Sequence, residues 1–91
     1  MTAELEGLAG EIRRRFPSLD VRTDQCEIIR IHLKKRAISL KVKEGRFYGG
    51  VYALDGECDF ETPVLAEFWG TDLEEFRRVA MGEVERWTAS A

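Results

Sequence analysis

Side chains that could carry acid–base, nucleophilic or metal chemistry are few among the 91 residues of this chain. His32 is the only histidine, and Cys26 and Cys58 are the only cysteines. The two cysteines lack the CxxC spacing of zinc and redox sites, so we expect small hydrophobic residues in a reducing compartment. Catalysis needs a nucleophile, a base or a metal in mutual reach, and the sequence pattern contains no such group. We therefore expect a protein without enzyme activity, catalytic residues, cofactor or metal.

Acidic residues alternate with other residue types between positions 55 and 61: Asp55, Glu57, Asp59 and Glu61. Their spacing differs from the Dx[DN]x[DN]G pattern of a calcium-binding loop, and the sequence has no GxxxxGK[ST], GxGxxG or HExxH motif. We expect an acidic surface that is either solvated or meets a basic protein surface, as in small inhibitors that are steered to their targets by charge.

The net charge of −3 conceals two segments of opposite sign. Residues 26–48 contain seven basic residues and two acids, which gives a charge of +5. Residues 49–91 contain three arginines and ten acids, which gives −7. The pI of about 5.2 argues against binding of polyanions over the whole surface, but it leaves room for a local basic patch.

Apolar residues spaced three and four apart predict a helix at each end of the chain. The first is expected over residues 3–16, because Pro17 pushes the preceding residue out of the helical conformation. The last is expected to start at the capping box Thr71-Asp72-Leu73-Glu74 and to run to about Trp87. Residues 88–91 are then a frayed tail.

A third, short helix is expected over residues 63–69, directly before the last one. Thr62 would be its N-cap, Pro63 its first residue and Gly70 its C-terminal stop.

A period of two in the middle of the chain predicts antiparallel strands, over residues 26–33, 36–43, 46–54 and 57–61. Two-residue turns would join them as hairpins, and Asp55-Gly56 is the strongest turn signal. The turns place these pairs on one face: Ile31–Ile38, Ile29–Leu40, Val42–Phe47, Leu40–Gly49, Ile38–Val51, Ala53–Cys58 and Val51–Phe60. Residues 19–21 are compatible with the start of a further strand.

These elements predict a single α+β domain over residues 1–91. We expect a two-layer sandwich: an N-terminal helix, an antiparallel meander of three to four strands, a short helix and a C-terminal helix, with the helices on one face of the sheet. The covered face would consist of Ile29, Ile31, Leu33, Ile38, Leu40, Val42, Phe47, Val51 and Phe60. The opposite face is left uncovered.

This uncovered face is the basis of the leading functional hypothesis. Small residues at its centre with tyrosines beside them predict a shallow concavity rimmed by charge. Such a face is either solvated or a docking surface, since Tyr and Arg are frequent interface anchors. The residues expected to contact a protein partner or a second copy are Ile28, Arg30, His32, Lys41, Tyr48, Tyr52 and Leu54. We expect a small protein-binding or accessory domain, of which an inhibitor of a partner protein is a special case.

The alternative hypothesis is a nucleic-acid-binding module. Basic side chains neutralise phosphates, and aromatic side chains on a sheet stack on bases. The residues that would bind nucleic acid are Lys34, Lys35, Arg36, Lys41, Lys43 and Arg46, with Arg30 and the sheet-face tyrosines beside them.

The first residues, Met1 to Glu6, have neither the basic start nor the apolar core of a secretory signal. No stretch approaches the roughly 18 consecutive apolar residues of a membrane-spanning helix. We therefore expect a cytoplasmic protein that does not bind membranes.

Overall fold

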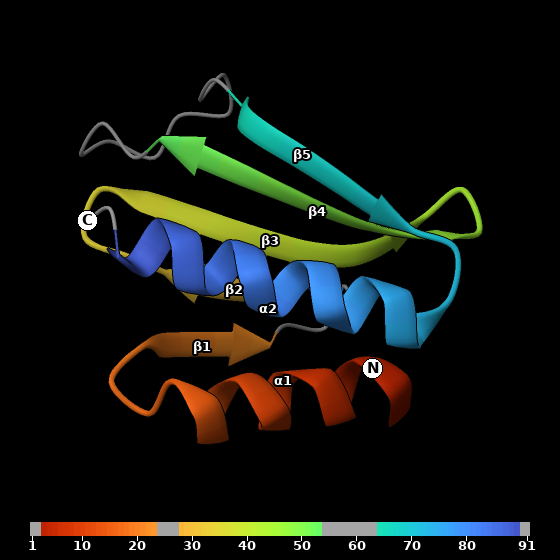
Figure 1. Cartoon of the computed structure of the whole chain (residues 1–91), viewed down its shortest axis with the longest axis horizontal. Helices are drawn as coiled ribbons and strands as arrows, with labels where there is room; N and C mark the ends of the chain where they lie inside the picture. Colours follow the sequence, from red (N-terminus) through yellow and green to blue (C-terminus); the bar gives the residue numbers. More distant parts are fainter. Residues whose placement is uncertain (1–2, 24–27, 54–63, 90–91) are drawn as a thin grey trace.

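The computed structural model describes residues 3–23, 28–53 and 64–89 (Figure 1). In this part of the chain, two helices flank five strands: α1 (Ala3–Arg15), β1 (Asp20–Thr23), β2 (Ile29–His32), β3 (Arg36–Lys43), β4 (Arg46–Ala53), β5 (Val64–Gly70) and α2 (Leu73–Ala89). The strands form one antiparallel sheet in the order β1-β2-β3-β4-β5. The predicted α+β fold is thus confirmed, with five strands in place of three to four.

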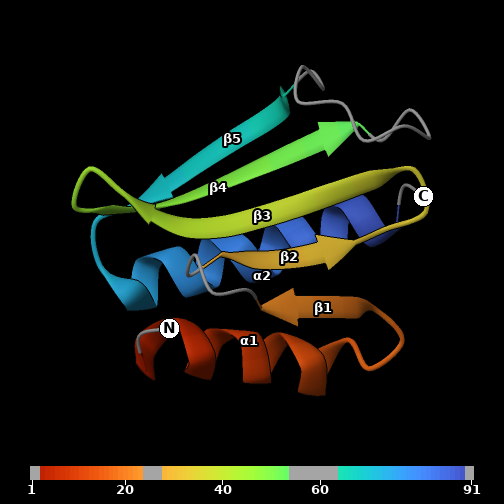
Figure 2. The same ribbon diagram turned by 180° about the vertical axis from the view of Figure 1, so that it is seen from behind.

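Both helices pack into one hydrophobic core on a single side of the sheet. Leu5 and Ile12 of α1 and Phe76 and Val84 of α2 are fully buried in it. The sheet contributes alternate residues of its strands: Ile29, Ile31, Ile38, Leu40, Val51 and Phe68. From behind, the strands lie in front of α2, so neither helix covers the other side of the sheet (Figure 2).

The predicted hairpin register is confirmed for every pair that lies within the described residues. Ile31 pairs with Ile38 across β2 and β3, and Ile38 pairs with Val51 across β3 and β4. The turn between β3 and β4 explains why the register is well defined. Glu44 and Gly45 have φ values of 55° and 75°, which is the left-handed pair of a tight type I′ hairpin turn.

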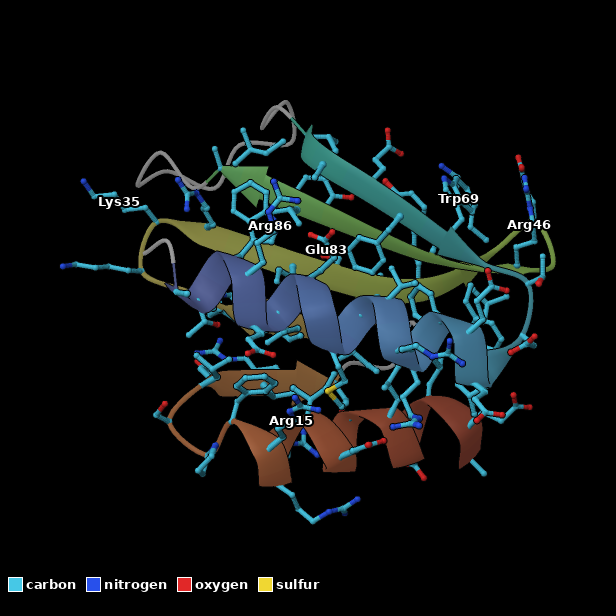
Figure 3. The ribbon with its side chains drawn as sticks, in the orientation of Figure 1. Arg15, Lys35, Arg46, Trp69, Glu83 and Arg86 are labelled. Atoms are coloured by element: carbon cyan, nitrogen blue, oxygen red, sulfur yellow. The ribbon has the colours of Figure 1, made fainter. Side chains whose placement is uncertain are left out.

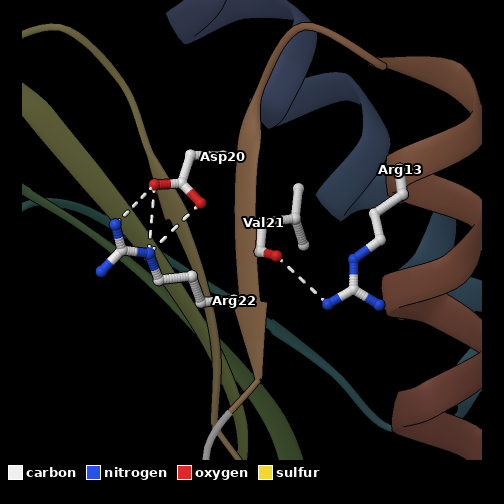
Figure 4. A network of polar contacts seen from close by, with 4 residues as sticks. All are labelled: Arg13, Asp20, Val21 and Arg22. Carbon is white, nitrogen blue, oxygen red and sulfur yellow. Dashed lines mark hydrogen bonds and ion pairs between the residues drawn. The ribbon is translucent and has the colours of Figure 1, made fainter.

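The short strand β1 joins the sheet next to α1. The Arg13 guanidinium of α1 donates a hydrogen bond of 3.1 Å to the Val21 carbonyl of β1 (Figure 4). Two ion pairs, Arg77–Glu11 at 2.8 Å and Arg15–Glu85 at 3.5 Å, connect α1 with α2. Helix α1 therefore lies along the β1 edge of the sheet.

The prediction of a short helix over residues 63–69 is wrong, because Val64–Gly70 form the edge strand β5. The apolar residues of this segment fit the periodicity of a helix as well as that of a strand, and packing against the rest of the sheet favours the strand. Phe68 pairs with Gly49 of β4, whose missing side chain leaves room for the Phe68 ring. Ala66 occupies the place beside Val51 that the prediction assigned to Phe60.

The predicted strand over residues 57–61 lies outside the described residues, as do Cys26, Leu54 and Cys58. Val42 is on the predicted covered face but is 46% exposed. It lies close to the β3–β4 turn, which projects beyond the end of α2 (Figure 1).

Helix α2 starts one residue later than the predicted capping box. The Asp72 carboxylate accepts a hydrogen bond of 2.8 Å from the Glu75 backbone N–H, so Asp72 and not Thr71 is the N-cap. The Thr71 hydroxyl donates to the Glu75 carboxylate at 3.0 Å. At its other end α2 runs to Ala89, so Thr88 and Ala89 are helical rather than frayed.

Replacement of Gly70 by alanine should lower the free energy of unfolding by about 1–3 kcal/mol. A Cβ at this position would lie 2.8 Å from the Phe76 Cα, which is backbone in the first turn of α2 and cannot move aside.

Gly7→Ala is the matched control for Gly70→Ala. A Cβ at Gly7 meets nothing within 4 Å, and alanine is the better helix former, so the substitution should stabilise the protein by about 0.5–1 kcal/mol. Urea denaturation of both variants measures the difference. If both substitutions changed the free energy of unfolding in the same direction, close packing of β5 against α2 would be contradicted.

Candidate docking site on the uncovered sheet face

The strand register sorts the side chains of the uncovered face into three cross-strand rows. The first row is Asp20, His32, Ala37 and Tyr52, the second is Arg22, Arg30, Ser39, Gly50 and Glu67, and the third is Lys41, Tyr48 and Trp69. These rows follow from the hairpin register confirmed above. Strand β1 extends the first two rows, and β5 extends all three, with Val64 opposite Tyr52 in the first.

The centre of this face is filled by tyrosine hydroxyls. A Cβ at Gly50 would lie 2.8 Å from the Tyr52 hydroxyl and 3.0 Å from the Tyr48 hydroxyl. The Tyr48 hydroxyl also donates a hydrogen bond of 2.8 Å to the Glu67 carboxylate. The space that the sequence predicted as a shallow concavity is therefore occupied by the ends of two side chains.

Tyr48 is held firmly in this arrangement, since its side chain is only 4% exposed. Burial raises the pKa of its hydroxyl well above the ordinary value of 10.0, and the hydrogen bonds with Glu67 and Tyr52 raise this pKa further. Tyr48 is therefore a neutral hydrogen-bond donor at physiological pH, and its buried ring is a fixed surface on which neighbouring side chains pack.

Around Tyr48 lies a group that we call the cation–aromatic cluster, consisting of Lys41, Lys43, Arg46, Tyr48 and Trp69. The ring centroids of Tyr48 and Trp69 are 4.6 Å apart. The Lys43 ammonium lies 5.0 Å and the Lys41 ammonium 5.8 Å from the centroid of the Tyr48 ring. The Arg46 guanidinium lies 4.8 Å from the centroid of the Trp69 ring. These distances are those of cation–π contacts, so the rings hold three positive charges at one end of the sheet.

Sequence reasoning missed Trp69 as a site residue because the segment was assigned to a helix. The signal was nevertheless present. In β5, Ala66, Phe68 and Gly70 alternate with Glu67 and Trp69, which is the period of a strand with one polar face.

The β1 end of the face carries an ion pair that the sequence analysis also missed. The Arg22 guanidinium contacts the Asp20 carboxylate through several atom pairs, the shortest at 2.8 Å (Figure 4). The hydrogen bond from Arg22 lowers the pKa of the Asp20 carboxyl below 3.8. Both side chains are exposed, so this pair contributes little to stability.

The structure places the other predicted docking residues as follows. Arg30 is exposed on β2, whereas Ile28, His32, Lys41 and Tyr52 are half-buried. Leu54 lies outside the described residues. His32 lies beside Asp20 of β1 and Ala37 of β3. Among the described residues, no group of three or more His, Cys, Asp or Glu side chains is arranged to hold a metal ion.

The residues predicted to bind nucleic acid do not form one patch. Lys41, Lys43 and Arg46 belong to the cation–aromatic cluster, whereas Lys34 and Lys35 lie in the turn before β3. Lys41, the nearest member of the cluster along the chain, is six residues of extended strand from Lys35, which is about 20 Å. Figure 3 shows Lys35 and Arg46 at opposite ends of the sheet.

Arg36 is separated from both groups. Its side chain is on the side of the sheet that α2 covers, and its guanidinium lies 4.9 Å from the centroid of the Trp87 ring of that helix.

Comparison with models of protein families, with curated proteins and with solved structures gave no match for this chain. Within the described ranges, neither helix combines the length and the apolar character needed to cross a membrane.

The raised pKa of Tyr48 predicts a loss of stability in alkaline solution. The unfolded chain ionises this hydroxyl near pH 10, whereas the folded chain resists ionisation, so the stabilisation is complete below pH 10 and declines as the pH rises above it. Urea denaturation at about pH 8 and about pH 11 should show this decline in the wild type.

The variant Tyr48→Phe tests whether ionisation of Tyr48 causes the loss of stability in alkaline solution. It loses the hydrogen bond to Glu67, which costs about 0.5–1.5 kcal/mol at pH 8, but the alkaline decline should be smaller than in the wild type. An equally steep decline in Tyr48→Phe would show that other groups cause it.

Proposed function

We propose that this protein is a non-enzymatic protein-binding domain that docks on a partner through the uncovered sheet face. The observation that carries the proposal is the cation–aromatic cluster. Trp, Tyr and Arg are the residue types that most often anchor protein interfaces, and here they are packed against one another before any partner is present. Such preorganisation lowers the entropy that a side chain loses on binding.

The ring geometry favours a protein partner over a nucleic acid. Base stacking requires an open aromatic face. Tyr48 is 4% exposed, and the Arg46 guanidinium lies over the Trp69 ring. The rings therefore serve to hold the cations in place, and the groups presented to a partner are Lys41, Lys43, Arg46 and the exposed part of Trp69.

The charge of the face favours a partner with an acidic surface. Within the described residues, its basic side chains are Arg22, Arg30, Lys41, Lys43 and Arg46, against the acids Asp20 and Glu67. Asp20 is paired with Arg22, and Glu67 accepts the Tyr48 hydroxyl. A second copy stacked face to face would oppose charges of the same sign, so this form of homodimer is disfavoured.

A pair of charge reversals tests the proposal. Lys41→Glu places a negative charge inside the face, whereas Arg78→Glu makes the same change of charge at an exposed position of α2. A direct partner captured from the native host should bind the Lys41→Glu variant at least about tenfold more weakly than the wild type, and the Arg78→Glu variant within about twofold of it. Affinities are measured with purified components.

Two results would contradict docking through this face. One is a partner that both variants bind equally well. The other is retardation of single- or double-stranded nucleic acid at about 50 mM salt that Lys41→Glu abolishes, which would favour the nucleic-acid hypothesis.

A further inference from the structure

We propose that the partner contributes an extended acidic segment, which adds to the sheet as a further strand along the outer edge of β5. This inference rests on the proposed function and specifies the chemistry of the partner. It starts from the difference between the two edges of the sheet.

The β1 edge is protected, whereas no helix or strand of the described residues lies outside β5. Helix α1 runs along β1, and Arg13 donates a hydrogen bond to the Val21 carbonyl. Within the described ranges, the backbone hydrogen bonds of β5 go to β4 on its inner side. Every second residue of an antiparallel edge strand directs its N–H and C=O groups outward, where they can pair with another chain.

The residues of β5 leave most of its edge open to such pairing. Exposed edges are commonly blocked by Pro, by Lys, by β-bulges or by very short strands. The pairing of β5 with β4 is irregular at Leu65, between the pairs Tyr52–Val64 and Val51–Ala66, so the regular part of this edge is residues 66–70. Strand β5 has seven residues, without Pro or Lys, and its only charged side chain is Glu67. Val64 and Leu65 at its start are each 45% exposed, which offers apolar contact to an added strand.

Charge at this edge selects the partner. Glu67 is directed inward, since its carboxylate accepts the hydroxyl of Tyr48 from the neighbouring strand β4. Arg46 is directed outward, since it starts on β4 but its guanidinium lies over the Trp69 ring of β5. The negative charge of Glu67 is thus directed toward the sheet, and the positive charge of Arg46 lies beside β5. Figure 3 labels Arg46 and Trp69 at this end of the sheet.

An added strand would lie about 4.8 Å outside β5. Its residue opposite Trp69 would point to the uncovered face, next to the Arg46 guanidinium. A carboxylate at that position would complete an ion pair with Arg46. Main-chain hydrogen bonds would provide affinity that is independent of sequence, and the acidic side chain would provide specificity.

A second copy of β5 fits this edge less well. Its only acid is Glu67, and that carboxylate is already engaged by Tyr48. A partner segment with free carboxylates at alternate positions matches Arg46 better. The occupant that we assign is therefore an extended acidic segment of another protein.

The test uses the whole chain and a capped eight-residue peptide of alternating valine and glutamate. Fluorescence anisotropy should show saturable binding to the wild type. Arg46→Glu should weaken binding by at least about tenfold, and Arg46→Gln by a smaller factor. Lys35→Glu, the same reversal of charge at the opposite end of the sheet, should change the affinity by less than about twofold.

Two further peptides separate strand pairing from simple charge attraction. The valine–glutamate peptide with N-methyl groups on alternate backbone nitrogens keeps every charge but cannot form the ladder, so its binding should be lost. A peptide of alternating valine and lysine should not bind.

Absence of binding, equal binding of the N-methylated peptide, or equal effects of Arg46→Glu and Lys35→Glu would each overturn pairing at β5. A dimer in sedimentation experiments that excludes the peptide would also overturn it, since a second copy would then occupy the edge. None of these results changes the comparison of Lys41→Glu with Arg78→Glu for a partner from the native host. Failure of pairing at β5 can therefore be distinguished from failure of the proposed function.

Discussion

The absence of side chains at two neighbouring positions of β4, Gly49 and Gly50, is the constraint on which most of the structure depends. Successive residues of a strand point to opposite faces, so one glycine opens space on each side of the sheet. On the helix side the ring of Phe68 occupies the space at Gly49. On the uncovered side the hydroxyls of Tyr48 and Tyr52 occupy the space at Gly50. A single dipeptide thus determines how β5 is seated and how the candidate site is filled.

Each contact of the candidate site depends on the position of the two tyrosine hydroxyls over Gly50. Because the Tyr48 hydroxyl lies over Gly50, it reaches Glu67 and its ring is buried. The buried ring then supports Trp69 at one side and the lysine ammonium groups at the other, and Trp69 in turn supports the guanidinium of Arg46. The positive end of the face is therefore built on hydrogen-bonded and packed groups, and not on isolated flexible side chains.

The sequence was sufficient to predict the fold class, the hairpin register and the uncovered face, because these depend on local alternation and on turns. The pairs from Ile29 to Val51 could be obtained by counting outward from two-residue turns. It was not sufficient for β5. The segment from Val64 to Gly70 has apolar residues at positions that suit a helix or a strand, and only the space at Gly49 and the contact of Gly70 with Phe76 favour the strand. Trp69 was missed for the same reason.

The basic hairpin shows why a charge run in a sequence is an unreliable guide to a charged surface. Strand alternation directs Lys41 and Lys43 to the uncovered face, and it directs Arg36 to the helix side, where it packs on Trp87. The length of β3 separates Lys34 and Lys35 from the remaining cations. What remains together is a smaller, ordered group of three cations on two aromatic rings, next to the edge strand. A partner that recognises this group must match both its charge and the direction of β5, which is a stricter requirement than attraction to a basic segment.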